Sequence, residues 1–313
     1  MKRLFSWAAL ILSISAVALA LLLAACSDDG SDGGGSDGGP RVVTSLEIFA
    51  DMVRNVGAER VDVDALLPSG ADPHTFELAP SRVADVADAD IVFINGLGLE
   101  AGIEDVITNN AGGPVIRLSD GLPVIQDDEE YTPEEGEEAP EGSNPHLWLD
   151  VRLGAQYVER IRDELIAIDP AGRATYEANA HAYLERLGDL DREMEAAVLA
   201  IPQERRKLVT FHDAYPYLAK RYGLEIAGVV VPSPGQEPSA QDVADLTDTI
   251  VSQGVPAVFK EPQFNAEILE RAAGEAGVRV LDLLSDAYAD GVDSYFSLIE
   301  YDIRQLQEGL GGG

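Results

Sequence analysis

The 313-residue sequence contains one cysteine, Cys26, and few basic residues, 22 against 56 acidic ones. A single cysteine cannot form an intramolecular disulfide, so the fold has to be stabilised by an ordinary hydrophobic core. The formal net charge of −34 argues against partners that are nucleic acids or anionic lipid surfaces, and it attracts cations over long range. Histidine is also scarce, with four residues, so the position of each one is informative.

The N-terminal segment has the pattern of an export signal. Lys2 and Arg3 precede residues 4–25, which contain no charged residue, as the charged and apolar regions of a signal do. The apolar run is also long enough for a membrane-spanning helix, so an uncleaved anchor or an ordinary cleaved signal is the alternative. Small residues lead directly into Cys26, which resembles the bacterial lipobox, where the cysteine is diacylated. We predict residues 1–25 as a lipoprotein signal peptide and Cys26 as the lipidation site, which would leave no thiolate for catalysis or metal binding.

Residues 26–40 are almost wholly Ser, Asp and Gly after the cysteine, a composition that cannot bury enough apolar surface to fold. We predict a flexible tether with a root-mean-square span of roughly 20 Å. Removal of the signal takes away two basic residues and no acidic one, which changes the formal charge from −34 to −36. The chain from residue 41 to residue 313 is long enough for two modest hydrophobic cores.

Short apolar runs alternate with helical patterns in the first and last thirds of this region. The strands are too apolar for a sheet with one face in water, so we predict mainly parallel sheets covered by helices on both faces. The predicted strands are residues 41–44, 61–67, 91–95 and 115–118, then 207–211, 226–231, 257–259 and 278–281. The predicted helices are residues 46–56 and 80–87, then 215–222, 239–253, 266–276 and 294–309, with further helix between residues 95 and 115.

The middle of the sequence is helical instead. Residues 150–168 have helical spacing, and residues 172–200 continue as a long helix with one apolar stripe. The predicted fold class is therefore α/β with two lobes joined by one linker helix. The domains are an N-terminal lobe (41–168), the linker (169–202) and a C-terminal lobe (203–313). A tethered protein of two lobes is typical of an extracytoplasmic receptor, although the fold alone does not decide the function.

Two histidines and one aspartate lie where a ligand site is expected. His74 lies in a loop after the second predicted strand, His212 directly follows the strand at 207–211, and Asp282 directly follows the strand at 278–281. The carboxyl ends of parallel strands are the edge at which open α/β sheets bind ligands. His146 follows Pro145 at the end of an acidic run. Two of these residues come from each lobe, so they can meet only in the cleft between the lobes.

Three imidazoles and one carboxylate suit Zn²⁺, and suit Mn²⁺ or Fe²⁺ less well. A single histidine in a loop is more often an ordinary surface or core residue, so the residue types alone leave a metal site and a structural role both open. His181, in the middle of the long helix, is interpreted as structural or exposed.

The sequence resembles the zinc and manganese solute-binding lipoproteins of bacterial ATP-binding-cassette importers over residues 41–310. Six segments carry the resemblance: Asp72-Pro73-His74, Asn95-Gly96-Leu97-Gly98-Leu99-Glu100, Asn144-Pro145-His146-Leu147-Trp148-Leu149-Asp150, Phe211-His212-Asp213-Ala214-Tyr215, Glu261-Pro262-Gln263-Phe264 and Asp293-Ser294-Tyr295. The resemblance implies that His74, His146 and His212 bind the metal and that an aspartate in the last strand-to-loop turn completes the site. Asp282 fits that position better by its distance to the Asp-Ser-Tyr segment, and Asp286 is the alternative.

The resemblance also implies the cargo and the partners. Family members with histidine at the third ligand position tend toward zinc and those with glutamate toward manganese, so His212 favours Zn²⁺, with Mn²⁺ as the alternative. The expected partner is an ABC permease with its ATPase subunit. We expect a monomer that is anchored by lipid to the outer side of the cell membrane and binds metal without covalent chemistry.

Further acidic residues have expected roles around this site. A carboxylate that accepts the second ring N–H of a histidine would orient it, and the candidates are Asp72, Asp150, Asp213 and Glu261. Zinc-specific family members often carry a histidine-rich loop before the second ligand, whereas residues 127–141 hold nine carboxylates and no histidine. We expect this acidic loop to be solvated and disordered, with weak cation capture as the functional alternative.

Two other functions fit fewer features of the sequence. A zinc-dependent surface hydrolase would need a general base, and the His-Glu-x-x-His spacing is absent. The glycines at 96, 98 and 102 depart from a dinucleotide fingerprint, and there is no Walker A sequence, so we expect no enzyme. In a metal-stabilised adhesin the metal would hold the fold together, whereas a receptor tolerates its loss. The long linker helix predicts only modest motion between the lobes.

Overall fold

The computed structural model describes residues 39–126, 129–134, 136–231, 235 and 239–312. All elements given below belong to one compact unit that begins at Gly39. The predicted signal peptide, Cys26 and all but the last two residues of the predicted tether lie outside the described residues. None of the helices within the described ranges is long and apolar enough to cross a membrane.

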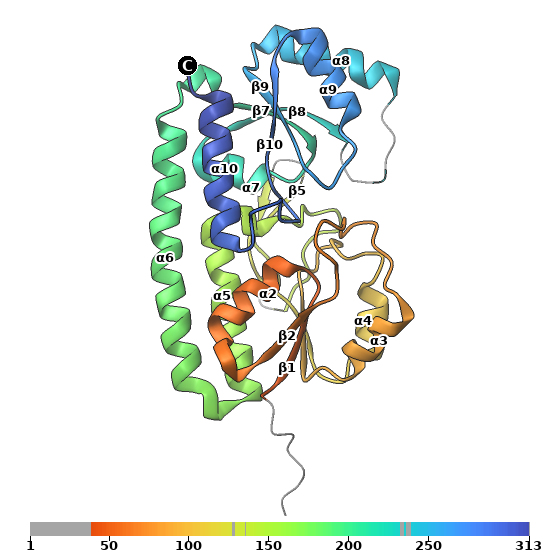
Figure 1. Cartoon of the computed structure of the whole chain (residues 1–313), viewed down its shortest axis with the longest axis vertical. Coiled ribbons are helices and arrows are strands. Elements are labelled where there is room, and N and C mark those ends of the chain that lie inside the picture. Colours follow the sequence, from red (N-terminus) through yellow and green to blue (C-terminus); the bar gives the residue numbers. More distant parts are fainter. Residues whose placement is uncertain (1–38, 127–128, 135, 232–234, 236–238, 313) are drawn as a thin grey trace, which may run out of the picture. The chain divides into compact units, whose positions relative to one another are not determined.

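The first sheet is parallel and has helices on both faces (Figure 1). Its strands are β1 (Arg41–Thr44), β2 (Asp62–Ala65), β3 (Ile91–Ile94) and β4 (Val115–Arg117), in the order β2-β1-β3-β4. Its helices are α2 (Glu47–Gly57), α3 (Pro80–Ala87) and α4 (Glu104–Asn110). Side chains alternate along β1, so that Val42 belongs to the core under α2 and Val43 to the separate core under α3 and α4. Burial of both faces explains why the central strand β3 is apolar throughout, whereas the edge strand β2 contains Asp62 and Asp64.

The second sheet repeats this arrangement without repeating the sequence. Its strands are β7 (Lys207–His212), β8 (Glu225–Val231), β9 (Ala257–Lys260) and β10 (Arg279–Asp282), all parallel, in the order β10-β9-β7-β8. Its helices are α7 (Pro216–Tyr222), α8 (Ala240–Gln253), α9 (Glu267–Ala276) and α10 (Tyr295–Leu310). The predicted α/β fold class with two parallel sheets is therefore confirmed, and most elements begin and end within one or two residues of their predicted bounds.

Two long helices connect the sheets. They are α5 (Val151–Ile168) and α6 (Arg173–Leu199), and the 27 residues of α6 correspond to a length of about 40 Å. The described residues also include four single-turn 3₁₀ helices: η1 (Ala58–Arg60), η2 (Leu147–Leu149), η3 (Pro170–Gly172) and η4 (Gln203–Arg205). Helix α6 spans both lobes (Figure 1), because Asn179 donates a hydrogen bond to the Val56 carbonyl at the end of α2 (3.0 Å) and Asp191 pairs with Arg221 of α7 (2.7 Å).

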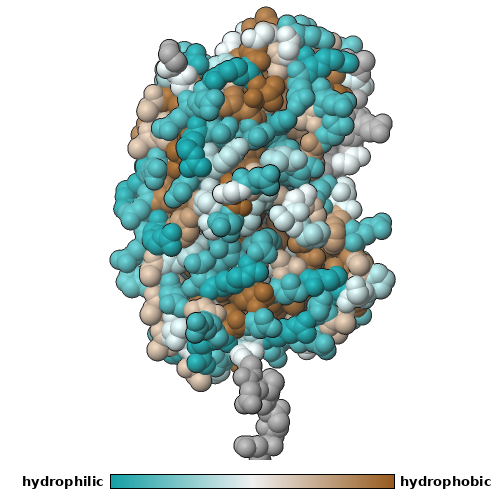
Figure 2. All heavy atoms as spheres, viewed as in Figure 1, coloured by the Kyte–Doolittle hydropathy of each residue, from teal (hydrophilic) through white to brown (hydrophobic). Residues whose placement is uncertain are grey.

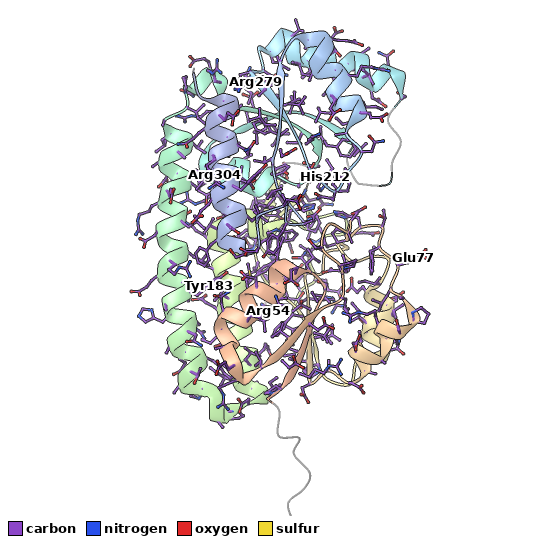
Figure 3. All side chains as sticks on the ribbon, viewed as in Figure 1. Arg54, Glu77, Tyr183, His212, Arg279 and Arg304 are labelled. Atoms are coloured by element: carbon purple, nitrogen blue, oxygen red, sulfur yellow. The ribbon has the colours of Figure 1, made fainter. Side chains whose placement is uncertain are left out.

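The buried side of α6 is formed by the apolar stripe that helical spacing predicted. Tyr176, Ala180, Tyr183, Leu187 and Leu190 are all buried. Figure 3 shows Tyr183 on the side of α6 that faces the body of the protein, and its ring packs edge-on against Phe296 of α10, with 4.7 Å between the ring centroids. The face in Figure 2 is mostly hydrophilic with hydrophobic residues between, which agrees with the acidic composition.

The acidic loop is more ordered than expected. Residues Glu129–Tyr131 form strand β6, which pairs antiparallel with β5 (Val124–Gln126). The expectation of a disordered loop is wrong for this part because β5 is anchored: Val124 is buried, and the Ile125 N–H donates to the Tyr217 hydroxyl (2.9 Å). The Gln126 side chain also donates to the Glu141 carbonyl (2.8 Å), which holds the far end of the loop. Three acidic residues of the loop, at positions 127, 128 and 135, lie outside the described residues.

Candidate metal centre

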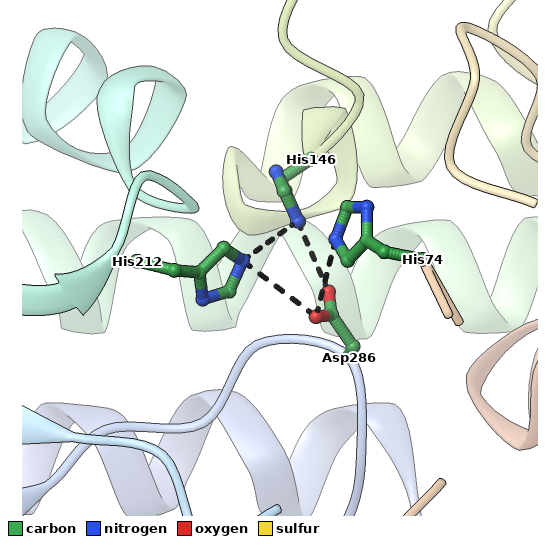
Figure 4. A group of neighbouring side chains, drawn as sticks. All are labelled: His74, His146, His212 and Asp286. Atoms are coloured by element: carbon green, nitrogen blue, oxygen red, sulfur yellow. Dashed lines mark hydrogen bonds and ion pairs between the residues drawn. The ribbon is translucent and has the colours of Figure 1, made fainter. Parts of the chain in front are cut away.

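Four side chains from separate parts of the chain meet at one buried point (Figure 4). They are His74, His146, His212 and Asp286, and one ligand atom of each lies within 4.8 Å of all the others. His146 Nε2 is 3.2 Å from His212 Nε2 and 3.2 Å from Asp286 Oδ1. Asp286 Oδ2 is 3.7 Å from His212 Nε2 and 3.8 Å from His74 Nε2. The three predicted histidines are therefore brought together with the alternative aspartate.

His74 is positioned by a turn that its own neighbours form. The Asp72 carboxylate accepts the backbone N–H of His74 (3.0 Å) and the side-chain hydroxyl of Thr75 (2.6 Å), an arrangement in which an aspartate side chain fixes the backbone two residues further on. Pro73 between them is buried. The His74 side chain is 15% exposed, against 3% or less for the other three, so His74 is the member of the group nearest to solvent.

His146 is held through the residue before it. Asn95 donates from its amide to the carbonyl of Pro145 (2.9 Å), and its amide oxygen accepts from the Tyr157 hydroxyl (2.6 Å). Asn95 begins a tight loop after β3 in which Gly96 has a φ of 84°, a conformation that favours glycine. The loop that resembled a dinucleotide fingerprint therefore serves as a support for the second histidine.

The carboxylate of Glu100 closes this loop. It is fully buried and accepts from the Ser45 hydroxyl (2.6 Å), the Asn95 N–H (2.7 Å) and the Gly96 N–H (3.2 Å). Burial raises the pKa of Glu100 to about 7, although these three hydrogen bonds favour the ionised form. Glu100 is thus a buried acid that organises the support of His146 without contacting the histidine.

His212 is the last residue of β7, and its outer ring nitrogen faces a carboxylate. Glu261, which follows β9, forms an ion pair with His212 Nδ1. Glu261 is fully buried and also accepts from the Ser285 hydroxyl (3.2 Å). Burial by itself would lower the pKa of His212, but the Glu261 charge outweighs it and the pKa rises to about 9. Nε2 of His212 is directed toward the other ligand atoms (Figure 4), and Figure 3 shows the residue between the two sheets.

The aspartate of the group is Asp286 and not Asp282. Asp282 ends β10, is only partly buried, and lies at 3.5 Å from the Tyr301 hydroxyl instead. The chain needs four more residues to reach the histidines, and their path is held by contacts from outside the loop. The Leu283 N–H donates to the Lys260 carbonyl, and the Leu284 N–H to the Asp302 carboxylate (both 2.8 Å). The expectation that Asp282 joins the three histidines is therefore wrong. The strand pattern and the spacing along the chain do not reveal the path that brings Asp286 to them.

The four candidates for orienting carboxylates have different roles. Glu261 contacts a histidine ring, whereas Asp72 contacts the backbone of His74. Asp150 caps helix α5 by accepting the Arg152 N–H (2.8 Å), and burial raises its pKa to about 6. The carbonyl of Asp213 accepts a hydrogen bond from Asn144 (2.6 Å).

The sequence analysis missed Asn144 and Asn95, because it searched for carboxylates and both residues are amides. Both lie in segments that carry the family resemblance, and this was the one indication of their roles in the sequence.

The electrostatics of the group suit a cation. Burial lowers the pKa of His74 to about 4 and also lowers the pKa of His146, so both imidazoles are neutral and can donate an electron pair near neutral pH. Burial would raise the pKa of Asp286, but the neighbouring histidines lower it below its usual range. Within the described part of the chain, His74 Nε2 and both carboxylate oxygens of Asp286 are buried without a hydrogen-bond partner. A buried carboxylate beside two neutral imidazoles is an arrangement suited to a divalent cation.

Comparison with known proteins decides the family. Residues 42–309 match the model of the family described as "Zinc-uptake complex component A periplasmic" (ZnuA). The chain belongs to this family. The manganese-binding lipoprotein MntA of Halalkalibacterium halodurans is 32% identical over 93% of this chain and 95% of its own length. The manganese ABC transporter substrate-binding lipoprotein PsaA of Streptococcus pneumoniae is 30% identical over 96% and 98%.

A solved structure agrees with this assignment. The periplasmic zinc binding protein TroA from Treponema pallidum has a TM-score of 0.78 with 28% identity, and the match covers 88% of this chain and all of TroA. This member of the ZnuA family is therefore a metal-binding receptor of an ABC importer and not an enzyme. Divalent metal binding is common to the named relatives, and this chain brings together a group of ligands suited to it.

Proposed function

We propose that this ZnuA-family protein binds Zn²⁺ through His74, His146, His212 and Asp286 and delivers it to an ABC permease driven by its ATPase subunit. The observation that carries the proposal is the meeting of three imidazole nitrogens and one carboxylate at a single buried point. Each of the four side chains would donate one atom, and the ion is cargo that has to be released again.

The distances support a small tetrahedral ion. In a tetrahedral site with zinc–ligand bonds of about 2.0–2.1 Å, the ligand atoms are about 3.3 Å apart. The separation of 3.2 Å between His146 Nε2 and His212 Nε2 is close to this value. Asp286 Oδ2 lies 3.7 Å from His212 Nε2 and 3.8 Å from His74 Nε2, somewhat farther than this value. Three nitrogen ligands also suit zinc better than manganese, which prefers oxygen.

Manganese is the second candidate, and one feature of the site favours it. Asp286 directs one oxygen toward His146 and the other toward His74 and His212, so the carboxylate is placed to bind with both oxygens. Such a site would be richer in oxygen and better suited to Mn²⁺. Two relatives, MntA and PsaA, carry manganese in their names.

Calorimetric titration of the chelator-stripped protein with Zn²⁺ and Mn²⁺ separates the two candidates. We expect one tight site for zinc and weaker binding of manganese. Asp286→Asn should abolish tight binding, while the matched variant Asp282→Asn, four residues earlier, should leave it unchanged. If manganese binds more tightly than zinc, manganese is the cargo and the proposal of zinc is wrong. Tight binding that survives Asp286→Asn and is lost in Asp282→Asn would reverse the assignment of the fourth ligand.

We further propose that the protein is a monomer anchored by lipid on Cys26 at the extracytoplasmic face of the cell membrane. The pattern of an uncharged apolar run that ends in small residues before the only cysteine supports this anchor. Labelling of cells with a fatty-acid analogue should mark the protein, and Cys26→Ala should remove the label while Ser27→Ala keeps it. Label on the Cys26→Ala variant would exclude this cysteine as the anchor.

A further inference from the structure

Asn144 connects two ligands that come from different lobes. Its side-chain oxygen accepts the backbone N–H of His146 (3.1 Å) and lies 3.0 Å from Nδ1 of the same histidine. Its side-chain nitrogen donates to the carbonyl of Asp213, the residue after His212 (2.6 Å). The Asn144 carbonyl in turn accepts from the Tyr217 hydroxyl (2.6 Å), which fixes the backbone at this point.

The chemistry of these partners leaves one orientation for the amide. The Asp213 carbonyl can only accept, so it has to face the NH₂ group of Asn144. The backbone N–H of His146 can only donate, so it has to face the amide oxygen. Because the two constraints agree, the oxygen faces His146 Nδ1, and that nitrogen has to carry the proton in order to form a hydrogen bond.

We infer that Asn144 is a positioning residue for metal binding: it holds His146 in the tautomer protonated on Nδ1 and ties it to the segment that carries His212. In this tautomer Nε2 has a free electron pair, and Nε2 is the atom that faces His212 and Asp286. The inference deepens the proposed function and rests on it, since the histidine that it orients is a proposed metal ligand.

The two supported histidines have different acceptors behind them. Nδ1 of His212 faces the carboxylate of Glu261, whereas Nδ1 of His146 faces a neutral amide. An aspartate at position 144 could still accept from His146, but its second oxygen would lie against the Asp213 carbonyl in place of a donor. An amide is therefore the side chain that can accept from His146 and also donate to Asp213, the residue after His212.

The tautomer can be measured without any metal. In the metal-free protein labelled with ¹⁵N in its imidazoles, long-range ¹H–¹⁵N spectra distinguish a protonated Nδ1 from a protonated Nε2, and a His146→Gln spectrum assigns the signals. We expect the Nδ1-protonated form for the unmodified protein and for Asn144→Asp, and its loss in Asn144→Leu. Asn179→Leu removes an amide hydrogen bond of α6 to a distant carbonyl and serves as the control that should keep the tautomer.

Zinc titration of the same variants tests the second part of the inference. Loss of an orienting partner costs roughly 10-fold to 100-fold in metal affinity, so we expect this loss for Asn144→Leu. Asn144→Asp should lose affinity although its tautomer is kept, because its link to Asp213 is broken. An unchanged tautomer and affinity in Asn144→Leu would overturn the inference. If Asn144→Leu does not fold, unchanged zinc affinity and dissociation rate in Asn144→Asp would overturn it.

These readouts keep this inference apart from the proposed function. A tautomer that changes in Asn144→Leu, in a protein that binds no zinc, would overturn the proposed cargo and retain the role of Asn144 in orienting His146. Tight zinc binding with no effect of any substitution at Asn144 would retain the cargo and overturn the role of Asn144.

Discussion

The indole nitrogen of Trp148 donates a hydrogen bond to the carbonyl of Ser285, which lies 137 residues later in the chain (3.0 Å). Trp148 is two residues after His146, and Ser285 is directly before Asp286, so this bond connects the supports of two proposed ligands from different lobes. Trp148 is fully buried, and its ring packs edge-on against Phe49 of α2 with 5.4 Å between the centroids. The position of Asp286 therefore depends on the first lobe as well as the second.

Trp148→Phe should weaken metal binding through this contact. The phenyl ring keeps most of the packing but leaves the buried Ser285 carbonyl without its donor, which costs about 1–3 kcal/mol of stability. We expect a lower zinc affinity as well, because the loop before Asp286 loses the hydrogen bond that fixes Ser285. Tyr176→Phe, which removes a hydroxyl bonded to Asp169 near the start of α6, should leave affinity unchanged. Equal zinc affinity in the Trp148 variant and the unmodified protein would contradict the connection.

Glu261→Gln should reduce zinc affinity by roughly 10-fold to 100-fold, because the orienting carboxylate behind a metal-bound histidine is replaced by a weaker acceptor. The matched control is Glu267→Gln at the start of α9, where the side chain is exposed. Competition with a chromogenic chelator measures both affinities. If the two variants bind zinc equally well, Glu261 has no role in holding His212.

Stability should depend on pH through Glu100. Its pKa is raised to about 7 in the fold from an ordinary value of 4.5, so between these values the folded state binds more protons than the unfolded state. The contribution of Glu100 to the free energy of unfolding therefore falls as pH rises through this window, by up to about 3 kcal/mol. Glu100→Gln removes this contribution.

Urea unfolding at about pH 5 and about pH 8 checks this sign for metal-free protein. The difference in stability between the unmodified protein and Glu100→Gln should shift in favour of the variant at the higher pH. The exposed Glu77→Gln serves as the control and should show no such shift. A difference that is constant across the window would mean that Glu100 ionises normally in the fold.

Asp191 should stabilise the junction of α5, α6 and α7 without affecting the metal. Its carboxylate accepts from Arg152 (3.2 Å), Arg221 (2.7 Å) and the Tyr222 hydroxyl (3.0 Å). Asp191→Asn weakens these charge-assisted bonds and should cost about 2 kcal/mol. Asp189→Asn, on the exposed side of the same helix, should stay within about 0.5 kcal/mol. Thermal unfolding compares the two, and similar midpoints would show that the buried cluster contributes little.

Metal binding should produce only a small change in the radius of gyration. Helix α6 is continuous over 27 residues and bonded to both lobes, and bending it would break its backbone hydrogen bonds. The Asp51 carboxylate of α2 also accepts the Tyr295 N–H at the start of α10 (3.0 Å). Small-angle scattering with and without zinc tests this, with Asp286→Asn as the variant that should not respond. A large compaction confined to the protein that binds zinc would contradict a rigid linker.

Much of the fold could be predicted because its signals are local. Helix α3 was predicted at residues 80–87, the bounds that it has in the structure, and the stripe from Tyr176 to Leu190 follows from helical spacing. Buried parallel strands have continuous apolar runs, which is why both sheets were recognised. The hairpin β5-β6 was not predicted, because its three-residue strands are short and one of them is mostly acidic.

The sequence by itself determined most of the secondary structure and the two-lobed α/β class, and it singled out three histidines as candidates, since periodicity and strand ends are properties of neighbouring residues. Only the tertiary structure decided between Asp282 and Asp286 and revealed Asn144 and Trp148. These positions depend on hydrogen bonds between residues 18 to 137 apart in the chain. Such contacts exist only once the two lobes have folded and packed along α6, and spacing along the chain does not encode them.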